Sequence, residues 1–192
     1  MRVFAAAIIG GIVMFLWGAV AHMALGLGDP GLRAPVHEDV ALNALHQGLG
    51  EAPGIYILPW LDPARINDPA AKAAYQQKAA NAPYAWVVYL PQGEDTTDMS
   101  RQLPRQWASD TLAALALAFT MSLSAFGFRK RMAIAAAGAL FAWLSVLVPY
   151  WNWYRFPASF TVAALVEQVL GWLLAGAAMA WWLGRQERKA PQ

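Results

Sequence analysis

Phe128-Arg129-Lys130-Arg131-Met132 places three consecutive cations between two long apolar runs, Thr111–Phe128 and Met132–Tyr150. A connection this short predicts that the two runs are neighbouring antiparallel helices. Lys and Arg residues beside a membrane helix stay on the cytoplasmic side, because they resist translocation. We therefore predict that these cations lie on the cytoplasmic side of the membrane. Each membrane crossing changes the side, so the side of every other segment follows from this one.

The composition favours a membrane protein. Of the 192 residues, 58% are hydrophobic and only 14% are charged, whereas about 25% are charged in an average soluble domain. The chain has no cysteine, which excludes disulfides, thiolate metal sites and cysteine nucleophiles. It also lacks GxSxG, the P-loop, and a GxGxxG that follows an expected strand, so no common hydrolase or nucleotide-binding signature is present.

The first apolar stretch, Val3–Gly28, is longer than the roughly 20 residues that a helix needs to cross the hydrocarbon core. Arg2 before it predicts a cytoplasmic N-terminus. A cleaved signal peptide is the alternative, because Ala19-Val20-Ala21 has the pattern of a signal-peptidase site. We expect a retained helix, so that residues 1–28 form the first membrane segment.

Residues 29–106 form the one long polar interval, with nine carboxylates against six cations. Start and stop signals predict the order α-β-α-β. A helix follows Pro35 and runs to about Gly48, and a second follows Asp68-Pro69. Strands are expected near Ile55–Leu58 and Trp86–Tyr89. The connection between them is long enough for a crossover, so we expect the strands to be adjacent and parallel.

Three further membrane helices are expected at 107–128, 132–150 and 158–184, with a short outer hairpin at 151–157. Residues 185–192 then form a cytoplasmic tail. Tryptophan and tyrosine residues gather at the expected outer and inner boundaries, as in aromatic belts. The predicted fold class is an all-α membrane protein of four transmembrane helices, with a small extracytoplasmic α/β domain, residues 29–106, between the first and second.

Glu167 is the most informative single residue. It lies about ten residues into the fourth helix, which at 1.5 Å per residue is near the bilayer midplane. A carboxylate there needs a polar partner or a proton, with Thr120 as the first candidate partner and Trp143 and Ser145 next. It then serves either as a proton relay or as a hydrogen bond between helices.

The same helix carries small residues at Ala164, Gly171 and Ala175, which we expect to pack closely on another helix.

His22 is the only histidine in an expected membrane span, and Gly11, Gly18 and Gly26 share its helical face. A glycine-lined face suits a flat haem or pigment macrocycle, with His22 as an axial ligand. The alternative is an interfacial histidine bonded to backbone or water. His37 and His46 are nine residues apart, which puts them on opposite helical faces, so we expect no metal site and no bound cofactor beyond the haem or pigment alternative.

These features predict a non-enzymatic accessory, scaffold or assembly subunit of a larger bacterial envelope complex in the inner membrane. The alternatives are a small proton-coupled transporter using Glu167 and a cofactor-binding membrane protein using His22. The expected partners are the lipid bilayer and either other membrane subunits or a second copy of the chain. Nucleic acid is not expected, because the basic residues follow the inner membrane boundaries.

Overall fold

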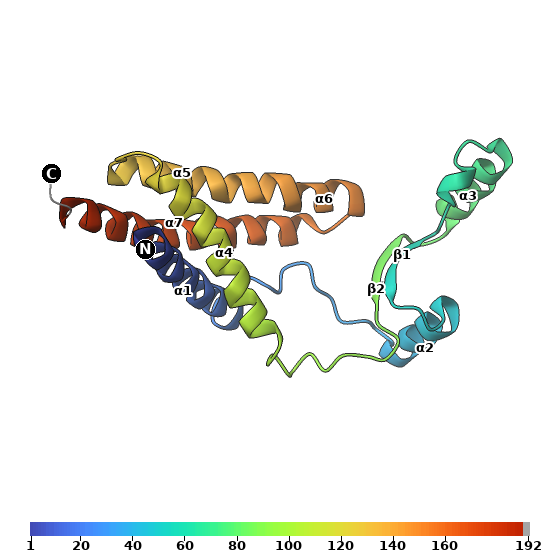
Figure 1. Cartoon of the computed structure of the whole chain (residues 1–192). Coiled ribbons are helices and arrows are strands. Elements are labelled where there is room, and N and C mark those ends of the chain that lie inside the picture. The colour runs from blue at the N-terminus through green and yellow to red at the C-terminus, as the bar shows by residue number, and fades with distance from the viewer. Residues whose placement is uncertain (190–192) are drawn as a thin grey trace. The chain divides into compact units, whose positions relative to one another are not determined.

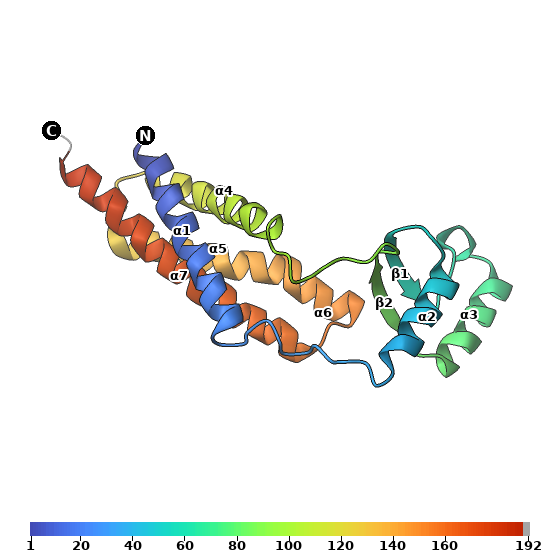
Figure 2. The same cartoon turned by 90° about the horizontal axis from the view of Figure 1, so that it is seen from below.

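The computed structural model describes residues 1–189 and is mostly helical (Figures 1 and 2). The chain divides into two compact units. The helical unit comprises Met1–Leu32 and the residues that follow Thr97, whereas the inserted unit comprises Arg33–Thr97.

The helical unit is built around α1 and the last helix, α7. Its elements are α1 (Arg2–Met23), α4 (Gln102–Ser122), α5 (Phe128–Ala142), the π-helix η2 (Trp143–Leu147), α6 (Val148–Tyr154) and α7 (Ala158–Lys189). Helix α1 packs against both α4 and α7, and α7 also packs against α5 (Figure 1). The start of α1 lies beside the end of α7, since the indole N–H of Trp182 donates to the carbonyl of Arg2.

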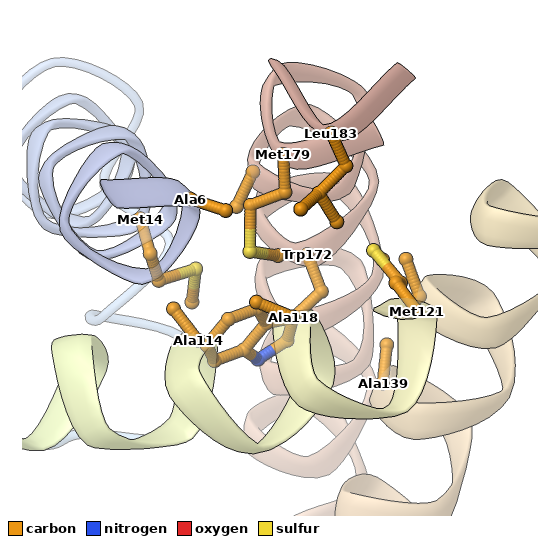
Figure 3. Close-up of a cluster of buried hydrophobic side chains, with 11 residues drawn as sticks. Ala6, Met14, Ala114, Ala118, Met121, Ala139, Trp172, Met179 and Leu183 are labelled. Atoms are coloured by element: carbon orange, nitrogen blue, oxygen red, sulfur yellow. The ribbon is translucent and has the colours of Figure 1, made fainter. Parts of the chain in front are cut away.

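The core of the helical unit is made mainly of small residues and methionine. Ala114 and Ala118 of α4 face Met14, Trp172 and Met179 in one buried cluster (Figure 3). Close contact depends on glycine at the α1–α4 crossing, because a Cβ on Gly11 would lie 2.7 Å from the Cα of Thr111. Small residues at helix contacts are typical of membrane bundles, where close backbone approach supplies much of the packing energy.

Large apolar side chains point outward instead. On α1 they recur every fourth residue, and the same spacing recurs on α7. The exposed residues are Phe4, Ile8, Ile12, Leu16 and Val20 on α1, and Val162, Val166, Leu170 and Leu174 on α7. Such continuous apolar stripes with a small-residue interior are the reverse of a water-soluble bundle and suit a lipid environment.

Three helical stretches within residues 1–189 are long and apolar enough to cross a membrane: Arg2–Met23, Phe128–Tyr154 and Ala158–Arg188. Helix α4 is not among them. Its first half carries Arg105, Gln106 and Asp110, which dilute the apolar run that begins at Thr111.

The turn around the basic cluster differs from the prediction. Helix α4 ends at Ser122 and α5 begins at Phe128, so the turn is formed by residues 123–127. Arg129, Lys130 and Arg131 therefore lie in the first turn of α5. The helix begins before the three cations because Gly127, in extended conformation, is the residue that precedes it.

The third apolar run forms one stretch that continues beyond Pro149. Pro149 has no N–H to donate to the residue four positions earlier, and the wider π-helix η2 immediately before α6 accommodates this loss. The helix ends at Tyr154, where Arg155 adopts a left-handed conformation with φ of 62°. The expected hairpin at 151–157 is thus reduced to the residues after Tyr154, and α7 extends through the expected tail to Lys189.

The inserted unit contains α2 (Glu38–Leu49), β1 (Gly54–Leu58), α3 (Pro69–Asn81) and β2 (Ala85–Tyr89). A short 3-10 helix, η1 (Pro63–Arg65), precedes α3. The order α-β-α-β is as predicted.

Asp68 begins α3 by accepting hydrogen bonds from the N–H groups of Ala70 and Ala71. The guanidinium of Arg65 donates to the same carboxyl at 2.8 Å and holds the pKa of Asp68 below its usual value. The helix cap therefore stays ionised and able to accept both N–H groups.

The expectation of parallel strands is wrong. β1 and β2 pair antiparallel, with Ile55 opposite Val88 and Leu58 opposite Ala85. A parallel crossover needs a helix that packs back across the sheet, whereas α3 makes at most marginal contact with the strands. Helix α3 instead belongs to the long connection of a β-hairpin. The last residue of β1, Leu58, pairs with the first residue of β2, Ala85.

Candidate functional site

Outside residues 29–106 the chain has only three carboxylates, Asp110, Glu167 and Glu187. A carboxylate in an apolar bundle is costly unless it is paired or protonated. In the structure each one has a polar partner, and the first two lie near one another. The candidate site is defined by His22 on α1, Asp110 on α4 and Glu167 on α7.

Glu167 joins α7 to α1 at two points. Its Oε1 lies 3.1 Å from Nε2 of His22, and its backbone carbonyl accepts a hydrogen bond from the indole of Trp17 at 2.9 Å. The Glu167 side chain is 19% exposed and that of His22 55%. The pair therefore lies at the edge of the bundle, with Glu167 as the more enclosed member.

The expected partners of Glu167 are engaged elsewhere. Thr120 donates to the carbonyl of Ala116, and Ser145 donates to that of Phe141. Hydroxyl side chains on helices commonly bond to the carbonyl four residues earlier, which removes them as partners between helices. The indole of Trp143 donates to the carbonyl of Thr161. The partner of Glu167 is His22 because α7 packs along α1 in this region.

Within the bundle, Glu167 is level with the last turn of α1, because its partner His22 lies there.

Asp110 is the site residue that the sequence reasoning missed. It is only 6% exposed, and its Oδ1 accepts a hydrogen bond of 2.9 Å from the amide of Gln106, one turn earlier. It also interacts electrostatically with Glu167. The sequence did contain a signal for it, because Asp110 is a carboxylate near the start of the second expected membrane helix.

Two carboxyl groups and an imidazole in one region can hold and exchange protons. His22 and Glu167 share one hydrogen bond, and Asp110 interacts electrostatically with Glu167. Among residues 1–189 no three His, Asp or Glu side chains are grouped so as to hold a metal ion.

The surroundings of His22 do not form a glycine-lined face. Gly11 contacts Thr111 on α4, and Gly18 faces open space. Gly26 lies beyond the end of α1. One nitrogen of His22 faces Glu167, and Gly28 packs so closely on the other side of the ring that a Cβ there would collide with Nδ1.

The small residues of α7 lie at its contact with α1 and in the core. Gly171 is buried against Met14 and Trp17, and Ala175 is fully buried. Ala164 is half-buried.

A second ionic contact lies at the other end of the bundle, where α1 begins. Arg131 is 1% exposed, and its guanidinium donates to Glu187 on α7 and to the carbonyl of Met121 on α4. Arg129 and Lys130 are exposed. The sequence predicts the same role for these three cations, but the structure separates them. Arg131 bonds to two other helices, α4 and α7, whereas Arg129 and Lys130 are exposed.

In the inserted unit, His37 precedes the first residue of α2 and His46 lies in the last turn of that helix. His46 lies within 3.4 Å of the Tyr89 hydroxyl and 4.0 Å of Glu51.

No protein-family model, curated protein or solved structure matches this chain.

Proposed function

We propose that the chain is an integral membrane protein of the bacterial cytoplasmic membrane that acts as a non-enzymatic accessory or assembly subunit of a larger complex. In this proposal α4 is the fourth spanning helix, both termini are cytoplasmic, and residues 29–106 lie in the periplasm. The observation that carries the accessory role is that the inserted unit lacks a core of its own.

The distribution of cations supports the topology. Arg131, near the start of α5, bonds to the end of α4. Trp182, near the end of α7, bonds to Arg2 at the start of α1. These contacts support placing the four helix ends at one end of the bundle. Arg129, Lys130 and Arg185 belong to the same end by their place in α5 and α7. A single basic end is the pattern of a cytoplasmic face, and it requires α4 to return the chain across the membrane.

Cysteine labelling of intact spheroplasts tests this topology. We expect Asp95→Cys to react with a membrane-impermeant maleimide and Lys130→Cys to react only after the membrane is permeabilised. Both positions are exposed in the structure, so a difference in reactivity reports the side of the membrane. The opposite pattern would reject the proposed orientation.

The inserted unit supports the accessory role because its apolar residues are left open. Pro59 is the only buried residue among Arg33–Thr97, all of which the structure describes. The cross-strand neighbours Ile55 and Val88 are 60% and 71% exposed on one face of the sheet. A two-stranded sheet is marginal by itself, and an uncovered apolar face marks a surface for another protein.

Site-specific photo-crosslinking in the native host tests this role. A photoreactive phenylalanine at position 88 should give one crosslinked product of discrete mass, because the apolar face is covered in the complex. The same residue at position 78, on the exposed and polar α3, is the matched control and should give none. A product at twice the chain mass would identify a second copy as the partner. Absence of any product at position 88, or equal products at both positions, would contradict the proposal.

A proton-coupled role is the second candidate, and the grouping of His22, Asp110 and Glu167 favours it. Glu167→Gln keeps the shape and hydrogen bonding of the side chain but cannot titrate. If the site moves protons, this variant should lose about 100-fold or more of any proton-dependent activity with its thermal stability retained. Thr120→Val, which removes a hydroxyl outside the site, is the control. Proton flux into liposomes that contain the purified protein measures the effect, and wild-type flux in Glu167→Gln would exclude the relay.

A further inference from the structure

A half-open cavity of about 400 Å³ lies at the Arg2 end of the bundle, where α5 begins and α7 approaches its end. Its lining includes Phe126, Phe128, Arg131, Trp181, Glu187 and Arg188. This size is within the range of small-ligand sites, which is about 300–1,000 Å³. The cavity belongs wholly to the helical unit.

The charge of the cavity is set by two guanidinium groups and one carboxylate. Arg131 is buried and held in place by Glu187 and by the carbonyl of Met121. Arg188 is exposed, and within the described residues it has no ion-pair or hydrogen-bond partner. The lining therefore carries one uncompensated positive charge, with one arginine fixed and the other free to close on a ligand.

Further cations surround the aromatic walls. The ammonium of Lys130 lies 5.8 Å from the centre of the Phe126 ring, and the guanidinium of Arg185 lies 5.4 Å from that of Trp181. Amphipathic aromatic residues next to cations are typical of the membrane–water interface. A ligand in this cavity would thus meet apolar ring surface beside the positive charge of the lining, whereas Lys130 and Arg185 stay outside the lining.

We infer that this cavity binds the phosphate of an anionic phospholipid headgroup, with Arg131 and Arg188 as its ligands. Guanidinium groups match the geometry of phosphate oxygens and can donate to them in pairs. Basic pockets between membrane helices on the cytoplasmic side are suited to anionic headgroups. The exposed apolar surface of Phe128 beside the cavity offers a place for the acyl chains. The inference requires the bundle to lie in a membrane, but it does not depend on the accessory role or on proton transfer.

The contribution of Arg188 separates a built site from general attraction to anionic lipid. Arg185 lies on the same helix three residues earlier, stacks on Trp181 and does not line the cavity. Arg188→Gln and Arg185→Gln therefore remove the same charge from the same end of the protein. Neither side chain is buried, so both variants should fold.

The test is titration of the purified full chain in neutral detergent, with binding followed by native mass spectrometry. Phosphatidylglycerol should bind with defined stoichiometry, and phosphatidylcholine, which has no net charge, should not. Arg188→Gln should weaken phosphatidylglycerol binding about tenfold, as expected for loss of a charged hydrogen bond, while Arg185→Gln should change it less than twofold.

Three results would overturn the inference. Equal weakening by the two variants would mean diffuse attraction between the basic end and anionic lipid. Equal binding of phosphatidylcholine would mean that the headgroup charge is not read. Binding of inorganic phosphate that depends on Arg188, without binding of phosphatidylglycerol, would assign the cavity to a free phosphate instead.

Discussion

Glu187→Ala should lower the free energy of unfolding of the helical unit by about 3–5 kcal/mol, because it leaves a buried guanidinium without its counter-ion. Arg131 is 1% exposed and its partner Glu187 is the one carboxylate bonded to it. The carbonyl of Met121 would remain as a single acceptor, which cannot balance the charge. Removal of one member of a buried pair is among the most destabilising single changes known in proteins.

The double variant Arg131→Met with Glu187→Leu is the decisive comparison. It removes both charges and keeps similar volume, so it should unfold near the wild-type temperature or above it. Arg129→Gln, which removes an exposed neighbour, should change stability by less than about 0.5 kcal/mol. Thermal unfolding in detergent measures all three. If Glu187→Ala unfolds like Arg129→Gln, the pair does not hold the helices together.

The burial of Arg131 was partly visible in the sequence. Ala135 and Ala139 follow it at intervals of four residues and are fully buried, so all three share the contact face of α5. The positive-inside rule treats Arg129, Lys130 and Arg131 as equivalent, because it reads charge and not helical phase. Helical phase was the signal needed to separate the structural cation from the two exposed ones.

Local signals were sufficient for the elements of the inserted unit but not for their pairing. Proline residues end the two strands, and Asp68 caps the start of α3. Each of these signals lies within a few residues of the boundary that it marks. The relative direction of the two strands depends on whether α3 packs back across the sheet. No local sequence feature predicts that packing. The same distinction explains Glu167, since its need for a polar partner follows from hydropathy, whereas the choice of His22 depends on how α7 lies along α1.

Gly171→Leu should destabilise the contact between α7 and α1 by about 1–3 kcal/mol, the usual cost of overpacking a core. A Cβ at this position would lie 2.5 Å from both Sδ of Met14 and Cδ1 of Trp17. Met14 can change rotamer, but Trp17 is held by its hydrogen bond to the carbonyl of Glu167. The added side chain must therefore push the helices apart where Met14 and Trp17 of α1 meet α7.

A graded series makes this prediction specific to the contact. Gly171→Ala should have a smaller effect than Gly171→Leu, because one methyl group needs a smaller displacement. Gly18→Leu on α1 is the matched control, since a Cβ there meets no atom within 4 Å, and replacing glycine within a helix by a better helix former gains up to about 1 kcal/mol. Thermal unfolding in detergent should therefore rank Gly18→Leu at or above wild type and Gly171→Leu well below it. Equal unfolding temperatures for the two leucine variants would mean that α7 does not approach α1 through Gly171.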